Sequence, residues 1–125
     1  MAKFIKFPIL KSNAAQPLGP SYDVLVNVDN IAEIEATGGT GQNAKTLVVT
    51  FINGPTNSQK VTFTIHTGIN GTGNPTLTTG KANPIYDAAV KALTANPGGV
   101  ISTVSLGKDQ ATTPAQVYFS TATYA

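Results

Sequence analysis

The amino-acid sequence predicts a mainly β fold, either a strongly bent antiparallel sheet or a small barrel, with one late α-helix at about residues 84–96. The strand prediction rests on apolar residues at every second position in Tyr22–Val28, Leu47–Phe51 and Val61–Ile65, which is the period of a strand with one buried face. Segments rich in glycine and asparagine separate these strands, as turns do. The helix prediction rests on an apolar stripe that follows later in the chain.

The length and composition of the chain indicate one soluble domain. Its 125 residues are enough for a single core without staples. The absence of cysteine excludes a disulfide framework, a thiolate metal site and a cysteine nucleophile. The N-terminus interleaves lysine with apolar residues, and no apolar run approaches membrane length. We therefore expect a protein that neither crosses a membrane nor is secreted by the usual route.

Charged residues are scarce in this sequence. Eight lysines against six acidic residues give a formal net charge of +2, and only 11% of the residues are charged. Arginine, the residue best suited to reading phosphate and guanine, is absent, and the lysines form no block. Nucleic acid is therefore not the expected partner. A surface so poor in charge is unusual for a free-standing protein, and two interpretations stay open: cover by an assembly, or a compositional bias of the source genome.

The N-terminal segment is set apart from the rest of the chain. Residues 1–21 are expected to form a strand or arm followed by a linker, and residues 22–125 a single β-rich domain. Pro8 lacks the N–H group that a sheet needs, so the strand over Lys3–Ile9 is predicted to lie at a sheet edge or to end there. Its apolar side chains are candidates for protein interaction (Phe4, Ile5, Phe7 and Ile9). The segment either docks on a neighbouring molecule or folds back on its own sheet.

Three or four strands in a row are expected over residues 22–67, joined as an antiparallel meander. The alternation of the first strand breaks at Asp29-Asn30, where Asx side chains favour a helical turn or a bulge. Beyond the break the apolar residues return to one face (Ala32, Ile34 and Ala36). Glu33 and Glu35 then point together to solvent.

The second half of the chain carries the helix and two further strands. Asn83 is a good N-cap, Pro84 fits the first helical position, and Pro97–Gly99 ends the helix. The small alanines of its apolar stripe would let the helix lie close to a sheet. Strands are expected over residues 100–106 and 115–121.

The long glycine- and threonine-rich loop over residues 68–82 has the composition of a phosphate-binding loop and contains Gly80-Lys81 near its end. The P-loop pattern fails because Pro75 stands where glycine is needed and Ala82 stands where a magnesium-binding hydroxyl is needed. No parallel βαβ unit surrounds the loop, so a dinucleotide site is not predicted either. The loop is either functional or simply mobile.

No catalytic, cofactor or metal site is predicted, and the chain is not expected to be an enzyme. His66 is the only histidine; it ends a strand and has no acidic residue or cysteine at metal spacing. The pair Glu33 and Glu35 is interpreted as part of a solvated face rather than as a cation site. Among the aromatic residues, four alternate with aliphatics at core positions (Tyr22, Phe51, Phe63 and Phe119). Three tyrosines are the candidates for an exposed contact surface (Tyr86, Tyr118 and Tyr124).

The order of these segments resembles that of a known group of proteins. The segments that carry the resemblance are Val28–Glu35, the strands Leu47–Ile52 and Val61–Ile65, and the stretch Ile85–Pro97 with its Ala-Leu-Thr-Ala-Asn-Pro-Gly-Gly ending. This pattern is similar to that of small uncharacterised proteins of marine cyanobacterial tailed phages. The resemblance implies a bent antiparallel sheet similar to the Sm-like or SH3-like small barrels. It supplies no functional residue.

The resemblance and the residues together favour a non-enzymatic phage structural or assembly protein. Such a virion decoration, cement or connector subunit would form a homo-oligomer, dock on a capsid or tail protein, and reside in the virion or the host cytoplasm. The expected mechanism is strand addition at a sheet edge, with Phe4–Ile9 as the donor. Deleting residues 1–20 is then expected to leave the domain folded but to abolish oligomer or particle binding. The alternative is an Sm-like protein that binds RNA or single-stranded nucleic acid.

Overall fold

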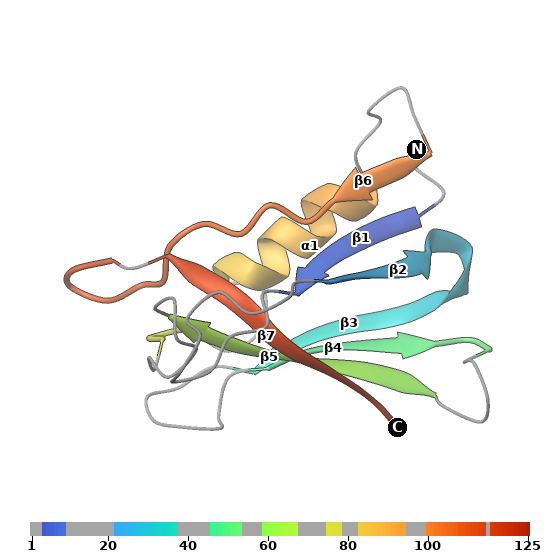
Figure 1. Ribbon diagram of the computed structural model, residues 1–125, viewed down its shortest axis with the longest axis horizontal. Helices are drawn as coiled ribbons and strands as arrows, with labels where there is room; N and C mark the ends of the chain where they lie inside the picture. Colours follow the sequence, from blue (N-terminus) through green and yellow to red (C-terminus); the bar gives the residue numbers. More distant parts are fainter. Residues whose placement is uncertain are drawn as a thin grey trace.

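The computed structural model describes residues 4–9, 22–37, 46–53, 59–67, 75–78, 83–94, 100–114 and 116–125. These residues contain seven strands, one short 3-10 helix and one α-helix (Figure 1). In chain order the elements are β1 (Phe4–Ile9), β2 (Tyr22–Asn27), η1 (Val28–Asn30), β3 (Ile31–Thr37), β4 (Thr46–Phe51), β5 (Lys60–Thr67), α1 (Pro84–Thr94), β6 (Ile101–Thr103) and β7 (Val117–Tyr124).

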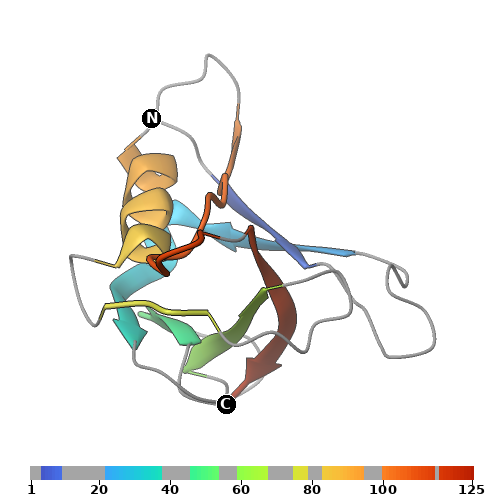
Figure 2. The ribbon, with the colours of Figure 1, turned by 90° about the vertical axis from the view of Figure 1, so that its left-hand side faces the viewer.

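All seven strands belong to one sheet in the order β2-β1-β7-β5-β4-β3, with β6 paired to β1 beside this path. The meander β3-β4-β5 is antiparallel, as predicted, whereas β1 runs parallel to both β6 and β7. The strands curl around a common interior with α1 on one side (Figure 2). β2 and β3 follow one another through η1 but do not pair, so the sheet stays open. The mainly β fold with a late helix is confirmed.

The prediction that β1 lies at a sheet edge is wrong. β1 lies between β2 on one side and β6 and β7 on the other. The Phe4 N–H donates to the Val100 carbonyl and the Val104 N–H donates to the Lys6 carbonyl, so the even-numbered residues of β1 direct their backbone groups toward β6. Pro8 falls between the pairing with β6, which ends at Lys6, and the pairing with β7 at Ile9. The sheet tolerates proline there because neither neighbour needs its N–H.

The core lies inside the curled sheet. Its centre is a cluster of three fully buried rings, Phe7, Phe63 and Phe119, with ring centroids 4.4, 5.2 and 6.0 Å apart. Branched aliphatic side chains from β1, β4 and β5 surround these rings. Because the inward residues of β1 contribute to this centre, the N-terminal strand is part of the fold of its own chain.

The helix α1 packs on β3 and β6. It buries Ile85, Ala89 and Ala92, three members of the predicted stripe. Asn83 caps it as predicted, since its side-chain oxygen accepts the Ile85 N–H at 2.8 Å. Pro84 is the first helical residue.

The turn at Asp29-Asn30 forms as predicted, whereas the strand after it differs in part from the prediction. The predicted turn at Asp29-Asn30 is η1, begun by the Asn27 side chain, which accepts the Asp29 N–H at 2.9 Å. A bulge between Ile31 and Glu33 leaves Ala32 exposed, although Ala36 is buried as expected.

The last two predicted strands differ in length from the observed ones. The strand expected over 100–106 is limited to β6, while the last strand reaches Tyr124. Residues 75–78 are the part of the 68–82 loop that the structure describes, and Leu77 is buried there. The predicted linker over residues 11–21 lies outside the described residues. The predicted boundary between residues 1–21 and 22–125 lies there too.

Candidate interaction surface

The outward side of β1, β2 and β6 carries several exposed apolar side chains. The register places Ile101 of β6 beside Phe4 of β1, and Leu25 of β2 beside Lys6. Leu25 and Ile101 are 51% and 43% exposed, and Val100, which precedes β6, is 57% exposed. Ile101 and Leu25, together with the half-buried Phe4 and Pro8, form a surface that we name the outer apolar face (Phe4, Pro8, Leu25 and Ile101).

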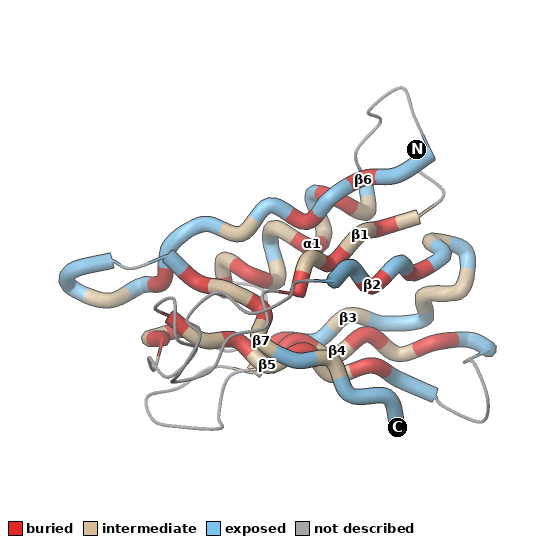
Figure 3. The backbone as a smooth tube through the Cα atoms, in the orientation of Figure 1, coloured by how far each residue is buried: buried red, intermediate tan, exposed pale blue. Residues whose placement is uncertain are grey.

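The outward side of the other half of the sheet is polar by contrast. On β4, β5 and β7 the outward positions are mostly threonine (Thr46, Thr50, Thr62, Thr64, Thr121 and Thr123). On β3 the exposed positions include Glu33 and Glu35. A sheet that packs one face on a core normally presents polar residues to water on the other. The β4-β5-β7 half follows this rule. The outer apolar face departs from it, because it presents apolar side chains to solvent on β2 and β6, which are largely exposed (Figure 3).

A crevice continues the outer apolar face toward β7. It has a volume of about 260 Å³ and lies where the neighbour of β1 changes from β6 to β7. Its lining includes Pro8, Leu106 and Tyr118, with the buried Val104 and Val117 beneath them. Tyr118 alternates with the buried Val117 and Phe119, so its side chain points outward. The crevice has room for a single apolar side chain at the margin of the face.

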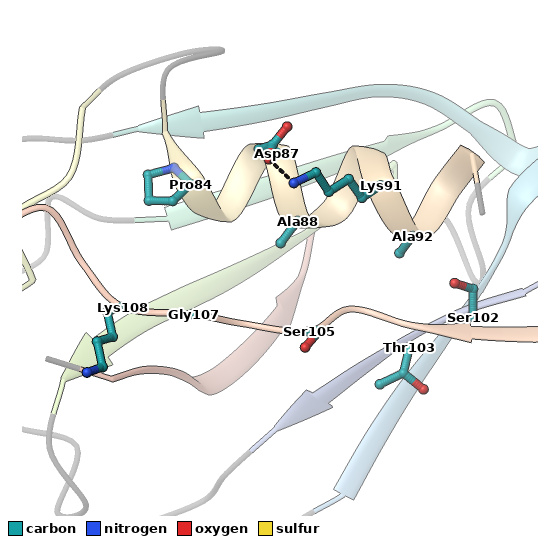
Figure 4. Close-up of a pocket in the computed structure, with 10 residues that line it drawn as sticks. All are labelled: Pro84, Asp87, Ala88, Lys91, Ala92, Ser102, Thr103, Ser105, Gly107 and Lys108. Atoms are coloured by element: carbon teal, nitrogen blue, oxygen red, sulfur yellow. Dashed lines mark ion pairs between the residues drawn. The ribbon is translucent and has the colours of Figure 1, made fainter. Parts of the chain in front are cut away.

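A second hollow, a polar groove, runs between α1 and the segment after β6 (Figure 4). Its volume is about 340 Å³, and Ala88 and Ala92 face it from the helix. Lys91 at its rim forms an ion pair with Asp87, with Nζ and Oδ2 2.9 Å apart. The remaining lining is Pro84, Ser102, Thr103, Ser105, Gly107 and Lys108.

The polar side chains of this groove can form hydrogen bonds with a ligand, but the described lining holds no imidazole that would act as a catalytic base for its serines. The described residues that line it include neither histidine nor cysteine, so the serines there have no imidazole base beside them. Across the described ranges of the chain, no three histidine, cysteine, aspartate or glutamate side chains gather as metal ligands would. His66 is half-buried on β5, opposite Tyr118, and its Nδ1 has no hydrogen-bond partner among the residues that the structure describes.

The structure does not bring the predicted interaction residues together. Ile5, Phe7 and Ile9 are 0–1% exposed in the core, so they are unavailable as a docking strip. Phe4 is on the outer apolar face and Tyr118 lines the adjoining crevice. The remaining two lie elsewhere: Tyr86 is half-buried on α1, and Tyr124 is 47% exposed at the end of β7, stacked near Phe51.

Leu25, Val100 and Ile101 were missed as surface residues. The signal for Leu25 is its position between Val24 and Val26, since only one face of an alternating strand can be buried. Val100 and Ile101 carry no such signal. Tyr22, predicted in the core, is 45% exposed because it begins β2, where the sheet ends.

Comparison with known proteins finds no matching family model, no matching curated protein and no matching solved structure. Among the described residues, no helix has the length and apolar character needed to traverse a bilayer; α1 has 11 residues.

Proposed function

We propose that this chain is a non-enzymatic structural or assembly protein that self-associates and docks on a protein partner. The observation that supports the proposal is the outer apolar face, set against the threonine-rich outward side of the same sheet. Combined with the resemblance to small tailed-phage proteins, it favours a virion decoration, cement or connector subunit. Such a subunit acts by covering and joining other subunits, so its working part is a surface.

The energetics of the outer apolar face favour association. Leu25 and Ile101 each keep about half of their surface exposed, and complete burial of such a side chain is worth about 1.5–3 kcal/mol. Covering the exposed halves therefore contributes roughly 1 kcal/mol each, or about 2 kcal/mol together. The centre of an interface is typically apolar and depleted in charge. The described register places two charged residues among these positions, Lys6 beside Leu25 and Asp23 beside Pro8, and they carry opposite signs.

A second candidate function is binding of RNA or single-stranded nucleic acid, as the Sm-like alternative implies. The observation that favours it is the polar groove, where Lys91 and Lys108 lie with serine and threonine hydroxyls. Asp87 neutralises Lys91, however, and the described lining holds no aromatic side chain on which a base would stack. Self-association is therefore the better-supported proposal.

Sedimentation velocity of two variants tests the proposal. The double variant Leu25→Thr, Ile101→Thr keeps β-compatible residues but removes the exposed apolar side chains of the face, and we expect it to sediment as a monomer where the parent protein sediments as an oligomer. Val48→Thr, an outward position of β4, is the matched control and should remain oligomeric. A double variant that associates as strongly as the parent would overturn the role of this face.

A further inference from the structure

The two ends of the open sheet are protected to different degrees. A free strand edge is a template for pairing with another chain, and proteins block such edges with charges, bulges, proline or a covering element. β3 has several of these features: exposed Glu33 and Glu35, a bulge between Ile31 and Glu33, and α1 packed against it. The β3 edge is therefore closed to a further strand.

β2 has only one of these features, the exposed charge of Asp23. Its register with β1 is regular from Phe4 opposite Asn27 to Ile9 opposite Tyr22. It contains no lysine, no proline and no bulge, and its central outward residue is the half-exposed Leu25. Figure 2 shows the beginning of β2 extending outward past β7. Among the described residues β1 is the one strand that pairs with β2, and no described strand pairs with the other edge of β2, which we call the open edge.

The backbone groups on this open edge can be assigned. The even-numbered residues of β1 face β6, and successive residues of a strand direct their N–H and C=O groups to opposite sides. The odd-numbered residues of β1 therefore bond to β2, and their partners are Tyr22, Val24 and Val26. The N–H and C=O groups of Asp23 and Leu25 and the N–H of Asn27 consequently point to the open edge, whereas the Asn27 C=O accepts the first bond of η1.

We propose that β2 of a second copy of this chain pairs antiparallel with β2 across a two-fold axis, with Leu25 opposite Leu25. In this register Asp23 lies opposite Asn27 in both directions, so the two Leu25 residues exchange both of their hydrogen bonds and each Asn27 N–H donates to the Asp23 C=O of the other copy. A shift of two residues either way leaves one of these residues unpaired. The inference rests on the proposed self-association and assigns the strand and the register that produce it.

The side chains favour a second copy over an unrelated strand. The Asp23 carboxylate faces the Asn27 amide, an acceptor opposite a donor, and no like charges oppose each other. The two Leu25 side chains meet at the axis, and on the inward side Val24 faces Val26. Because Leu25 belongs to the outer apolar face, the pairing also joins the two faces into one surface, which is the surface left to dock on a partner.

Placing a charge at residue 25 tests the register. In the proposed dimer residue 25 of one copy lies opposite residue 25 of the other, so a substitution there faces the same substitution in the partner copy. In Leu25→Lys, and separately in Leu25→Glu, like charges face each other, and we expect the dimer dissociation constant to rise about tenfold or more. An equimolar mixture of the two variants should restore a heterodimer in native mass spectrometry. Circular dichroism should show both variants folded, since residue 25 is half-exposed.

Ile101→Lys and Ile101→Glu form the matched control pair. Ile101 is on the same face with similar exposure, but β1 separates it from β2, so mixing these variants should give no preferential heterodimer. A parent oligomer whose Leu25 variants either stay associated or fail to recover on mixing would overturn the β2 register while leaving the proposed function intact. A parent protein that is monomeric throughout would contradict both.

Discussion

Phe7→Ala, compared with Phe4→Ala in the same strand, tests the placement of β1 inside the fold. Phe7 is fully buried and stacked on Phe63 with ring centroids 4.4 Å apart, and it also meets Phe119 at 6.0 Å. Truncating a buried phenylalanine costs about 3–5 kcal/mol. The half-buried Phe4 points outward, so its truncation should cost only about 1 kcal/mol.

Urea denaturation measures this difference. With a denaturant slope of about 1.5 kcal/mol/M for a small domain, Phe7→Ala should lower the unfolding midpoint by about 2–3 M, and Phe4→Ala by under about 1 M. Total stability for a domain of this kind is about 5–15 kcal/mol, so the Phe7 variant should be marginal yet measurable at low temperature. Equal midpoints for the two variants would show that β1 is peripheral and would refute the assignment of its inward residues to the core.

Two further predictions follow from the same packing. Deleting residues 1–20 should abolish cooperative folding, because it removes a central strand that pairs with β2, β6 and β7; a truncated protein with an intact strand signal in circular dichroism would show instead that the N-terminal segment is dispensable. Asn83→Ala should cost about 1 kcal/mol of unfolding free energy, because the Ile85 N–H loses its acceptor. Asn83→Ser keeps an acceptor and should lie closer to the parent protein, and equal losses in the two variants would contradict the capping role.

The alternation of residues predicted the strands well because it reports directly which side of each strand is buried. It predicted the meander through β4 and β5 and the inward residues Phe51 and Phe63. The helix was predictable because its cap, its first-turn proline and its apolar stripe agree. These are local signals, and the structure preserves them.

The neighbours of a strand were not predictable from alternation alone. Pro8 correctly signalled a missing donor, but the sheet accommodates it where the pairing of β1 changes from β6 to β7, a feature that depends on residues about 100 positions later in the chain. For the same reason the docking strip was misplaced: Ile5, Phe7 and Ile9 alternate equally well at an edge or at the centre of a sheet. The outer apolar face depends on pairing between β1, β2 and β6, so Leu25 and Ile101 became a candidate surface only when the register was known.

The solution mass of the parent protein by light scattering, measured over a range of concentrations with the ratio of absorbance at 260 and 280 nm, tests self-association most directly. We expect a mass at least twice that of the chain at high concentration, falling toward the monomer on dilution, with no absorbance from nucleic acid. A protein that stays monomeric at every concentration, or an oligomer that carries nucleic acid, would contradict the account.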